Sequence, residues 1–361
     1  MTTIRDLRAW REDDPQAWNS FVDAAPYGTF TQLWQWGELK AGGGWRPLRL
    51  CVGGPGQPVA GVQLLIRRVP VVGWSLGYAP RGPIGALDVP AVRGRLIEAL
   101  RELGREERLA TVRVDPETGP DEPYGAALLD RPWRRARGVQ APWTRLVDLG
   151  RDEDTLRAEM RPKHRQYVAK ARRASVVIER LDGPDVDSPA IRGALADFYR
   201  IVDITARRTG FALRLPAYYK QAWQQFAPVG RCRLYFAVQG GERVATIFHF
   251  LCGQRAVEAW GGMVDEAGPT RANYLLKWQA MMDLRADGYT AYDMWGLANT
   301  GIRQFKEGFG GREVRYIGAR ELPLSTLGDT GVRLAVGGYG SLQRLRARLR
   351  GERASEREET V

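Results

Sequence analysis

A single lysine stands between aromatic residues and glycines in the segment TGIRQFKEGFGG, positions 300 to 311. Phe305 precedes Lys306, and three glycines follow within five positions. Two interpretations compete. Lys306 is either a solvated charge on a glycine-rich hairpin or an ammonium group held where negative charge develops. A fixed donor beside a developing oxyanion lowers a reaction barrier by several kcal/mol, so the second interpretation would make this segment catalytic.

The residues that several other chemistries require are missing from the sequence. There are two histidines: His164 in a basic run and His249 within TIFHF, where a buried structural role is expected. No HExxH or HxE…PCxxC metal pattern, GxSxG elbow or GxxxxGK[ST] loop occurs. The three cysteines form no CxxC pair, so neither a zinc knuckle nor a disulfide framework is indicated, and a reducing cytoplasm fits best.

Two parts of the chain repeat one order of elements, about 180 positions apart. Segments from Trp45 and from Gly230 each predict two apolar strands around a glycine-containing turn, then an aromatic-rich strand (GWSLGYAP and AVEAWGGM). An amphipathic helix follows in each copy, and then a strand that ends in an acidic residue (LATVRVD and TAYDMWG). The fold class is therefore α/β (α+β), with two tandem acyltransferase domains of the GNAT type and mixed sheets flanked by helices. Splayed strands in this unit leave a cleft for an acyl donor.

Neither copy carries the loop that binds coenzyme A in such domains. The expected pattern, (Arg/Gln)xxGx(Gly/Ala), places backbone amides around a pyrophosphate at a helix N-terminus. The helix starts read EAGPTRANYLL and GALDVPAVRG instead. The acyl group is therefore expected to arrive on another carrier.

The charge of the chain favours polyanionic partners. The net charge is +12 and the pI is about 9.9, which suits RNA or an anionic lipid surface, although basicity for solubility alone is the alternative. A basic helix is predicted from Arg157 to Arg173, and a short basic amphipathic helix from Ser341 that frays into a disordered end. The N-terminus lacks the apolar core of a signal peptide, and no run reaches the ~18 apolar residues of a membrane span. A soluble or peripheral protein is expected.

Five segments in this order resemble the Fem family of transferases, which build peptidoglycan cross-bridges. They are TFTQLWQWGELK, YAPRGPIG, MRPKHRQYVAKARRASVVIE, ARRTGFALR and AYDMWGLANTGIRQFKEGFGG, and the similarity extends from about Phe30 to about Gly318. The resemblance implies an aminoacyl-tRNA donor and a lipid-linked or nucleotide-linked muramyl-pentapeptide acceptor. It also implies that no cofactor, metal or ATP is needed, because an aminoacyl ester is already activated. No heptad-rich insertion lies between Thr205 and Tyr235, so the compact form of the family is expected.

The resemblance implies roles for five residues of the first copy. Trp36 and Lys40 share a face of one helix, and the matching lysine of relatives contacts the acceptor's phosphates; a solvated lysine at a helix end is the alternative. Tyr78 and Arg81 lie in YAPRGPIG, and Tyr78 is either at the acceptor pocket or a core aromatic. Asp88 matches, with loose spacing, an acidic residue that follows this motif in relatives.

The remaining candidates lie in the second copy. Arg214, with Arg207 and Arg208 as alternatives, matches a diphosphate-binding arginine. Tyr292 is expected to line the second cleft, whereas Asp293 is expected to cap the following turn. Phe305 and Lys306 match the pair at the catalytic centre of relatives. The residues indicate no general base.

These implications give three segments: residues 1–150 as the acceptor-binding domain, 151–316 as the aminoacyl-tRNA side, and 317–361 as a segment packing back on the first. The expected protein is a cytoplasmic monomer, with peripheral contact at the inner face of the plasma membrane as a further possibility. Two alternatives stay open. One is an N-acyltransferase that uses acyl-CoA or acyl carrier protein on polysaccharides or amino sugars. The other is a non-catalytic RNA- or membrane-binding protein.

Overall fold

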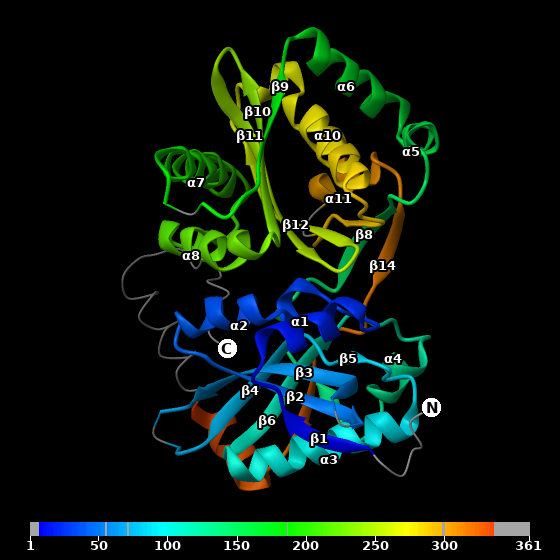
Figure 1. Cartoon of the computed structure of the whole chain (residues 1–361), viewed down its shortest axis with the longest axis vertical. Coiled ribbons are helices and arrows are strands. Elements are labelled where there is room, and N and C mark those ends of the chain that lie inside the picture. The colour runs from blue at the N-terminus through cyan, green and yellow to red at the C-terminus, as the bar shows by residue number, and fades with distance from the viewer. Residues whose placement is uncertain (1–6, 55, 71, 186, 298–299, 336–361) are drawn as a thin grey trace. The chain divides into compact units, whose positions relative to one another are not determined.

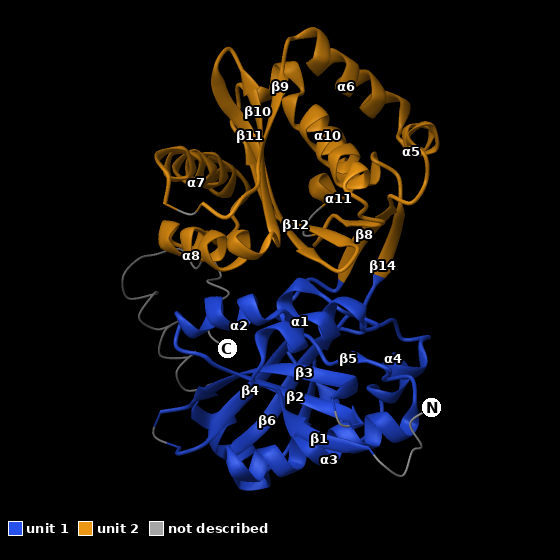
Figure 2. Cartoon of the chain, viewed as in Figure 1, with its two compact units in different colours: residues 1–142, 315–361 blue, residues 143–314 orange. Residues whose placement is uncertain are grey.

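The computed structural model describes residues 7–54, 56–70, 72–185, 187–297 and 300–335 (Figure 1). The chain divides into two compact units, residues 1–142 with 315–361 and residues 143–314 (Figure 2). The first division thus falls at 142 rather than at 150. The reason is that strand β8 (Trp143–Asp148) pairs with β13 in the sheet of unit 2.

Unit 1 is built on a mixed sheet. Its described strands have the order β1-β2-β3-β4-β6-β15-β7, and β5 pairs with β3. Strand β15 follows unit 2 in the sequence and pairs antiparallel with β6 of unit 1. The strands are β1 (Arg8–Arg11), β2 (Arg46–Gly54), β3 (Gln57–Arg68), β4 (Ser75–Arg81), β5 (Ile84–Gly85), β6 (Leu109–Pro116), β7 (Arg134–Arg135) and β15 (Arg320–Pro323).

Unit 2 has a second mixed sheet with the strand order β14-β8-β13-β12-β11-β10-β9. Helix α7 packs on β11 and β12, while α10 packs on β10 and β11 from the other side of the sheet (Figure 1). Besides β8, the strands are β9 (Val177–Leu181), β10 (Cys232–Gln239), β11 (Glu242–Cys252), β12 (Arg255–Met263), β13 (Ala291–Asp293) and β14 (Arg312–Arg315).

Proline and capping residues mark where many of the helices begin. Pro189 starts α7, and the Ser188 hydroxyl accepts a hydrogen bond from the Ile191 amide, because a first-turn amide has no partner within the helix. The helices are α1 (Pro15–Ala24), α2 (Trp34–Ala41), α3 (Pro90–Glu106), α4 (Pro123–Ala127), α5 (Glu153–Glu159), α6 (Pro162–Arg173), α7 (Pro189–Thr209), α8 (Pro216–Phe226), α9 (Ala267–Thr270), α10 (Ala272–Ala286) and α11 (Thr300–Glu307), with 3₁₀ turns η2 (Phe30–Gln32) and η3 (Ala227–Val229).

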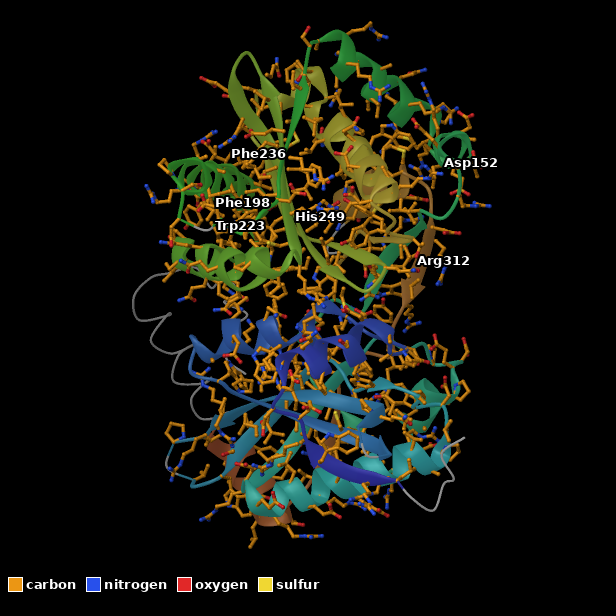
Figure 3. All side chains as sticks on the ribbon, in the orientation of Figure 1. Asp152, Phe198, Trp223, Phe236, His249 and Arg312 are labelled. Atoms are coloured by element: carbon orange, nitrogen blue, oxygen red, sulfur yellow. The ribbon has the colours of Figure 1, made fainter. Side chains whose placement is uncertain are left out.

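The predicted duplication is confirmed. The hairpins β2–β3 and β10–β11 are each followed by a third strand, a helix and a fourth strand, which are β4, α3 and β6 in unit 1 and β12, α10 and β13 in unit 2. Strand β11 separates two kinds of packing in unit 2. Phe248 and Phe250 contact Phe198, Trp223 and Phe226 of α7 and α8. Phe198 and Trp223 are labelled in Figure 3. His249, between them in sequence, is buried against Tyr235 and Tyr292.

The helices differ from the sequence-based expectations in the basic run. The basic run from Arg157 is not one helix, because Pro162 begins a new one and the chain turns at Met160 and Arg161. The predicted basic helix from Ser341 lies outside the described residues. Among those described, no helix combines the length and the hydrophobicity needed to cross a membrane.

Candidate functional site

In the sheet of unit 2, strand β13 is much shorter than its neighbour β12. The two strands pair in parallel only over Arg255–Val257 and Ala291–Asp293. Strand β12 then continues to Met263, so Glu258 is its first residue beyond this ladder. In unit 1 the equivalent strands stay paired along the whole of Ser75–Arg81. The pairing of the third and fourth strands of the repeat thus ends early in unit 2 and continues along the whole third strand in unit 1. The sequence analysis expected splayed strands where the hairpin meets the next strand, but β11 and β12 stay paired there.

Lys306 lies beside the end of β13. Its Nζ atom donates hydrogen bonds to the carbonyl oxygens of Met294, Trp295 and Gly296, at 2.5, 2.6 and 2.8 Å. Burial lowers the pKa of Lys306 to about 8, although the charges of Glu258 and Asp293 oppose that shift. The segment is a helix, α11, and not the hairpin of the first interpretation. All three ammonium protons are engaged, so Lys306 offers a fixed positive charge rather than a free donor in this conformation.

A network of polar groups connects strands β11, β12 and β13 with helix α10. Glu258 Oε2 accepts hydrogen bonds from Lys277 Nζ and from the Tyr292 hydroxyl, both at 2.5 Å. His249 Nε2 lies 2.9 Å from the same hydroxyl. Burial lowers the pKa of His249 to about 3, so the imidazole is neutral. Burial alone would raise the pKa of Glu258, but the positive charges of Lys277 and Lys306 hold it below its usual value. The carboxylate is therefore ionised.

Aromatic rings pack around the FK pair. Phe305 contacts Tyr274 and Phe309 with ring centroids 5.0 and 5.3 Å apart. Lys277 Nζ lies 5.2 Å from the centre of the Phe305 ring, and His164 Nε2 lies 3.1 Å from the Phe305 carbonyl oxygen. A Cβ atom on Gly308 would lie 2.0 Å from the His164 ring, so only glycine permits this approach. The ring contacts fix the helix that carries Lys306.

Trp36 and Lys40 lie together on α2 of unit 1, as their spacing predicts. Lys40 Nζ lies 4.8 Å from the centre of the Trp36 ring, and Trp36 packs edge-on against Phe30. Trp36 is buried, whereas Lys40 is half-buried. The tryptophan thus supports the lysine stem, and a role for Lys40 in binding phosphates stays a prediction.

Tyr78 and Arg81 belong to the interior of unit 1. The Tyr78 hydroxyl accepts a hydrogen bond from Gln140 at 3.2 Å. Arg81 is fully buried, donates to the Ala141 carbonyl oxygen at 2.7 Å and pairs with Glu117 at 3.5 Å. Tyr78 and Arg81 can therefore affect binding only indirectly, by holding the loop that contains Gln140 and Ala141.

Asp88 is exposed, before the start of α3. It accepts hydrogen bonds from the Tyr124 amide at 2.9 Å and the Tyr27 hydroxyl at 3.3 Å. Arg214 lies between α7 and α8, and its guanidinium is 5.2 Å from the centre of the Tyr218 ring. Neither contact tests the predicted binding roles.

Comparison with known proteins gives two matches that together cover much of the chain. The FemAB family matches residues 14–122, and an acetyltransferase (GNAT) domain matches residues 158–307. Both lie where the sequence showed the duplicated unit. The chain is similar to the FemAB family over residues 14–122.

Curated relatives of this chain include the lipid II:glycine glycyltransferases of Staphylococcus saprophyticus and Staphylococcus aureus. They are 27% identical over 234 residues and 24% identical over 230 residues. Each alignment covers 61% of this chain, with 53% and 52% of the relative. The chain thus spans about half the length of the curated relatives that it matches. The solved structure of FemX, at 18% identity, aligns with a TM-score of 0.80 over 90% of this chain and 98% of that one. It confirms the fold class.

The structure brings some of the predicted site residues together. Lys306, Phe305 and Tyr292 meet around Glu258 and Lys277, which the sequence analysis missed. Tyr292 is fully buried and positions Glu258. Asp293 caps the following turn as predicted, because its Oδ1 accepts from the Trp295 amide at 2.8 Å. The described ranges contain no group of three or more His, Cys, Asp or Glu that could hold a metal ion.

A signal for the missed pair was present in the sequence. Lys277 stands within the apolar run ANYLLKWQAMM, and Glu258 stands within the strand AVEAW. Charged side chains are seldom buried unless they are paired. Two opposite charges at core positions of neighbouring elements therefore indicate a buried ion pair.

Proposed function

We propose that this chain is an aminoacyltransferase that moves an amino acid from aminoacyl-tRNA to the stem-peptide amine of a peptidoglycan precursor. The precursor is lipid II or UDP-MurNAc-pentapeptide, and the product is the first part of an interpeptide bridge. The match to the FemAB family over residues 14–122 and the two glycyltransferase relatives support this proposal. The observation that carries it is the buried ammonium group of Lys306 just after β13, where the pairing with β12 ends, in a unit whose sequence lacks a coenzyme A loop.

The reaction needs little from the protein beyond position and charge. The acceptor amine attacks the ester carbonyl, a tetrahedral oxyanion forms, and the ribose hydroxyl of the tRNA leaves as the amide bond is made. In the proposed mechanism the Lys306 charge stabilises the oxyanion. A direct hydrogen bond requires one of the three carbonyl oxygens around Nζ to give way to the substrate oxygen.

The remaining candidates are proposed to bind the acceptor. Lys40 in unit 1 and Arg214 in unit 2 are each a candidate cation for a phosphate group, since charge-assisted hydrogen bonds to phosphate are strong. Asp88 is the exposed residue among the binding candidates of unit 1 and is also proposed to contact the acceptor. The proposed place of action is the cytoplasm, at the inner face of the plasma membrane when the acceptor is lipid-linked.

The decisive experiment supplies the purified protein with a mixture of charged tRNAs and either lipid II or UDP-MurNAc-pentapeptide. Mass spectrometry of the precursor is expected to show the mass of one amino-acid residue added. A parallel reaction with acetyl-CoA and acyl carrier protein thioesters tests the alternative of an N-acyltransferase. Transfer from a thioester and from no charged tRNA would refute the proposal.

Basic residues on α6 are proposed to contact the RNA. Lys170, Arg172 and Arg173 are exposed, and none has an ion-pair partner within the described ranges. Replacing both arginines with glutamine is expected to weaken tRNA binding and to lower the slope of log K against log salt by about 1 to 2, because each phosphate contact contributes ~0.7–0.9. Filter binding at several salt concentrations measures the slope. The matched control is R101Q/R105Q on α3, and an equal loss in both variants would contradict a specific contact.

The pKa of Lys306 predicts how transfer depends on pH. Because that pKa is lowered to about 8, the ammonium is present below this pH and is lost as the pH rises through it. Single-turnover transfer with saturating substrates is therefore expected to fall on the alkaline side of about pH 8. A rate that keeps rising to pH 10 would show that the charge of Lys306 is not needed.

A further inference from the structure

The carboxylate of Glu258 uses only one of its two oxygens within the protein. Lys277 and Tyr292 both donate to Oε2. Oε1 accepts no hydrogen bond from any residue that the structure describes, and it is not an enclosed atom. The side chain is 11% exposed, against 2% for Lys277. Oε2 is thus held by Lys277 and Tyr292, whereas Oε1 can accept a hydrogen bond from a ligand.

The position of Glu258 connects that oxygen with the reacting centre. Glu258 is the first residue of β12 that β13 leaves unpaired, and the carbonyls around Lys306 belong to the three residues that follow β13. The charges of Glu258 and Lys306 are close enough for each to shift the pKa of the other. A substrate group bound beside Lys306 therefore lies in the field of this carboxylate.

The Glu258 carboxylate is better suited to binding a cationic ligand than to abstracting a proton. Lys277 and Lys306 keep the pKa of Glu258 below its usual value, so the carboxylate is a weak base near neutral pH. An ionised carboxylate with a free oxygen binds ammonium groups through charge-assisted hydrogen bonds. Lys277 and Tyr292 fix its orientation, which lowers the cost of presenting that oxygen to a ligand.

We propose that Glu258 Oε1 binds the α-ammonium group of the aminoacyl donor and so restricts the donor to α-aminoacyl esters. This inference rests on the proposed function. In such an ester the α-nitrogen is two bonds from the carbonyl carbon, and in this proposal the ammonium of a donor bound beside Lys306 faces Glu258. An acyl, hydroxyacyl or N-acylated donor leaves the carboxylate without that partner. Glu258 is thus a specificity-determining residue, and Lys277 and Tyr292 are positioning residues.

The test compares two donors that differ in one group. The charged tRNA that the wild-type protein uses is assayed beside the same tRNA after nitrous acid has converted its amino acid to the α-hydroxy acid. The hydroxyacyl ester is similar in shape and uncharged, and its transfer still forms an amide with the acceptor. The wild-type protein is expected to prefer the aminoacyl donor by about 10²-fold in kcat/KM. E258Q is expected to reduce that preference to less than about tenfold, mainly by losing activity on the aminoacyl donor.

Two further variants separate recognition from folding. E258Q leaves Lys277 without its charge partner, so E258Q/K277M is included, because it removes both charges; it is expected to show the same loss of preference. E242Q, at an exposed position in the β10–β11 hairpin, is expected to keep the wild-type preference.

The outcomes distinguish the inference from the function on which it rests. Absence of transfer from every charged tRNA overturns both. Equal use of the two donors by the wild-type protein overturns the inference and leaves the function standing. An equal loss on both donors in E258Q and in the double variant also overturns it, because Glu258 would then serve the reaction without recognising the ammonium.

Discussion

Lys306→Met is expected to reduce kcat for amino-acid transfer by about 10²- to 10³-fold, the range measured when one oxyanion-stabilising group is removed. KM for either substrate is expected to change little, because the charge acts on the transition state more than on the ground state. Single-turnover transfer followed by mass spectrometry or with labelled amino acid measures the effect. A variant with at least one third of the wild-type kcat would remove Lys306 from the mechanism.

Lys306→Gln separates the charge from the structural role of the side chain. The ammonium holds the carbonyls of Met294, Trp295 and Gly296, so its removal also weakens this segment. Glutamine keeps two N–H donors for those carbonyls and carries no charge. If the charge matters, K306Q is as inactive as K306M while its melting temperature is closer to that of the wild type. Recovery of activity in K306Q would instead show that holding the segment is the whole role of Lys306.

Lys277→Met is expected to give the largest loss of stability. The Lys277–Glu258 pair is buried, and removing one partner leaves the other charge without compensation. Breaking such a pair costs about 3–5 kcal/mol. Urea unfolding followed by fluorescence is expected to show an earlier transition for unit 2. K277M/E258Q is expected to recover part of the loss, because no unpaired charge remains.

An exposed ion pair of the same type provides the control. Lys220 Nζ lies 3.8 Å from Asp187, and the two side chains are 47% and 67% exposed. Such a pair contributes about 0–1 kcal/mol, so K220M is expected to unfold almost with the wild type. Similar effects of K277M and K220M would mean that the buried pair does not hold β12 against α10.

Local patterns were sufficient to predict the elements and the fold class. Alternating and helical spacing of apolar residues placed both hairpins, the helices α3 and α10 and the strands that follow them. The same patterns predicted that His249 is buried and that Asp293 caps a turn. The patterns were misleading at two places. Pro162 begins a new helix, so the basic run forms two helices instead of one. The glycines after Lys306 follow a helix and do not form a hairpin.

The site depended on contacts between residues far apart in the chain. Lys306 as a candidate, the basic charge and the missing coenzyme A loop were evident from the sequence. Tertiary structure alone decided that the pairing of β12 with β13 ends after three residues while β4 stays paired with β6. It also decided that Lys277 and Tyr292 donate to one oxygen of Glu258. The physical reason is that periodicity reports which side of an element is buried, whereas strand pairing and ion pairing depend on which elements meet after the chain has folded.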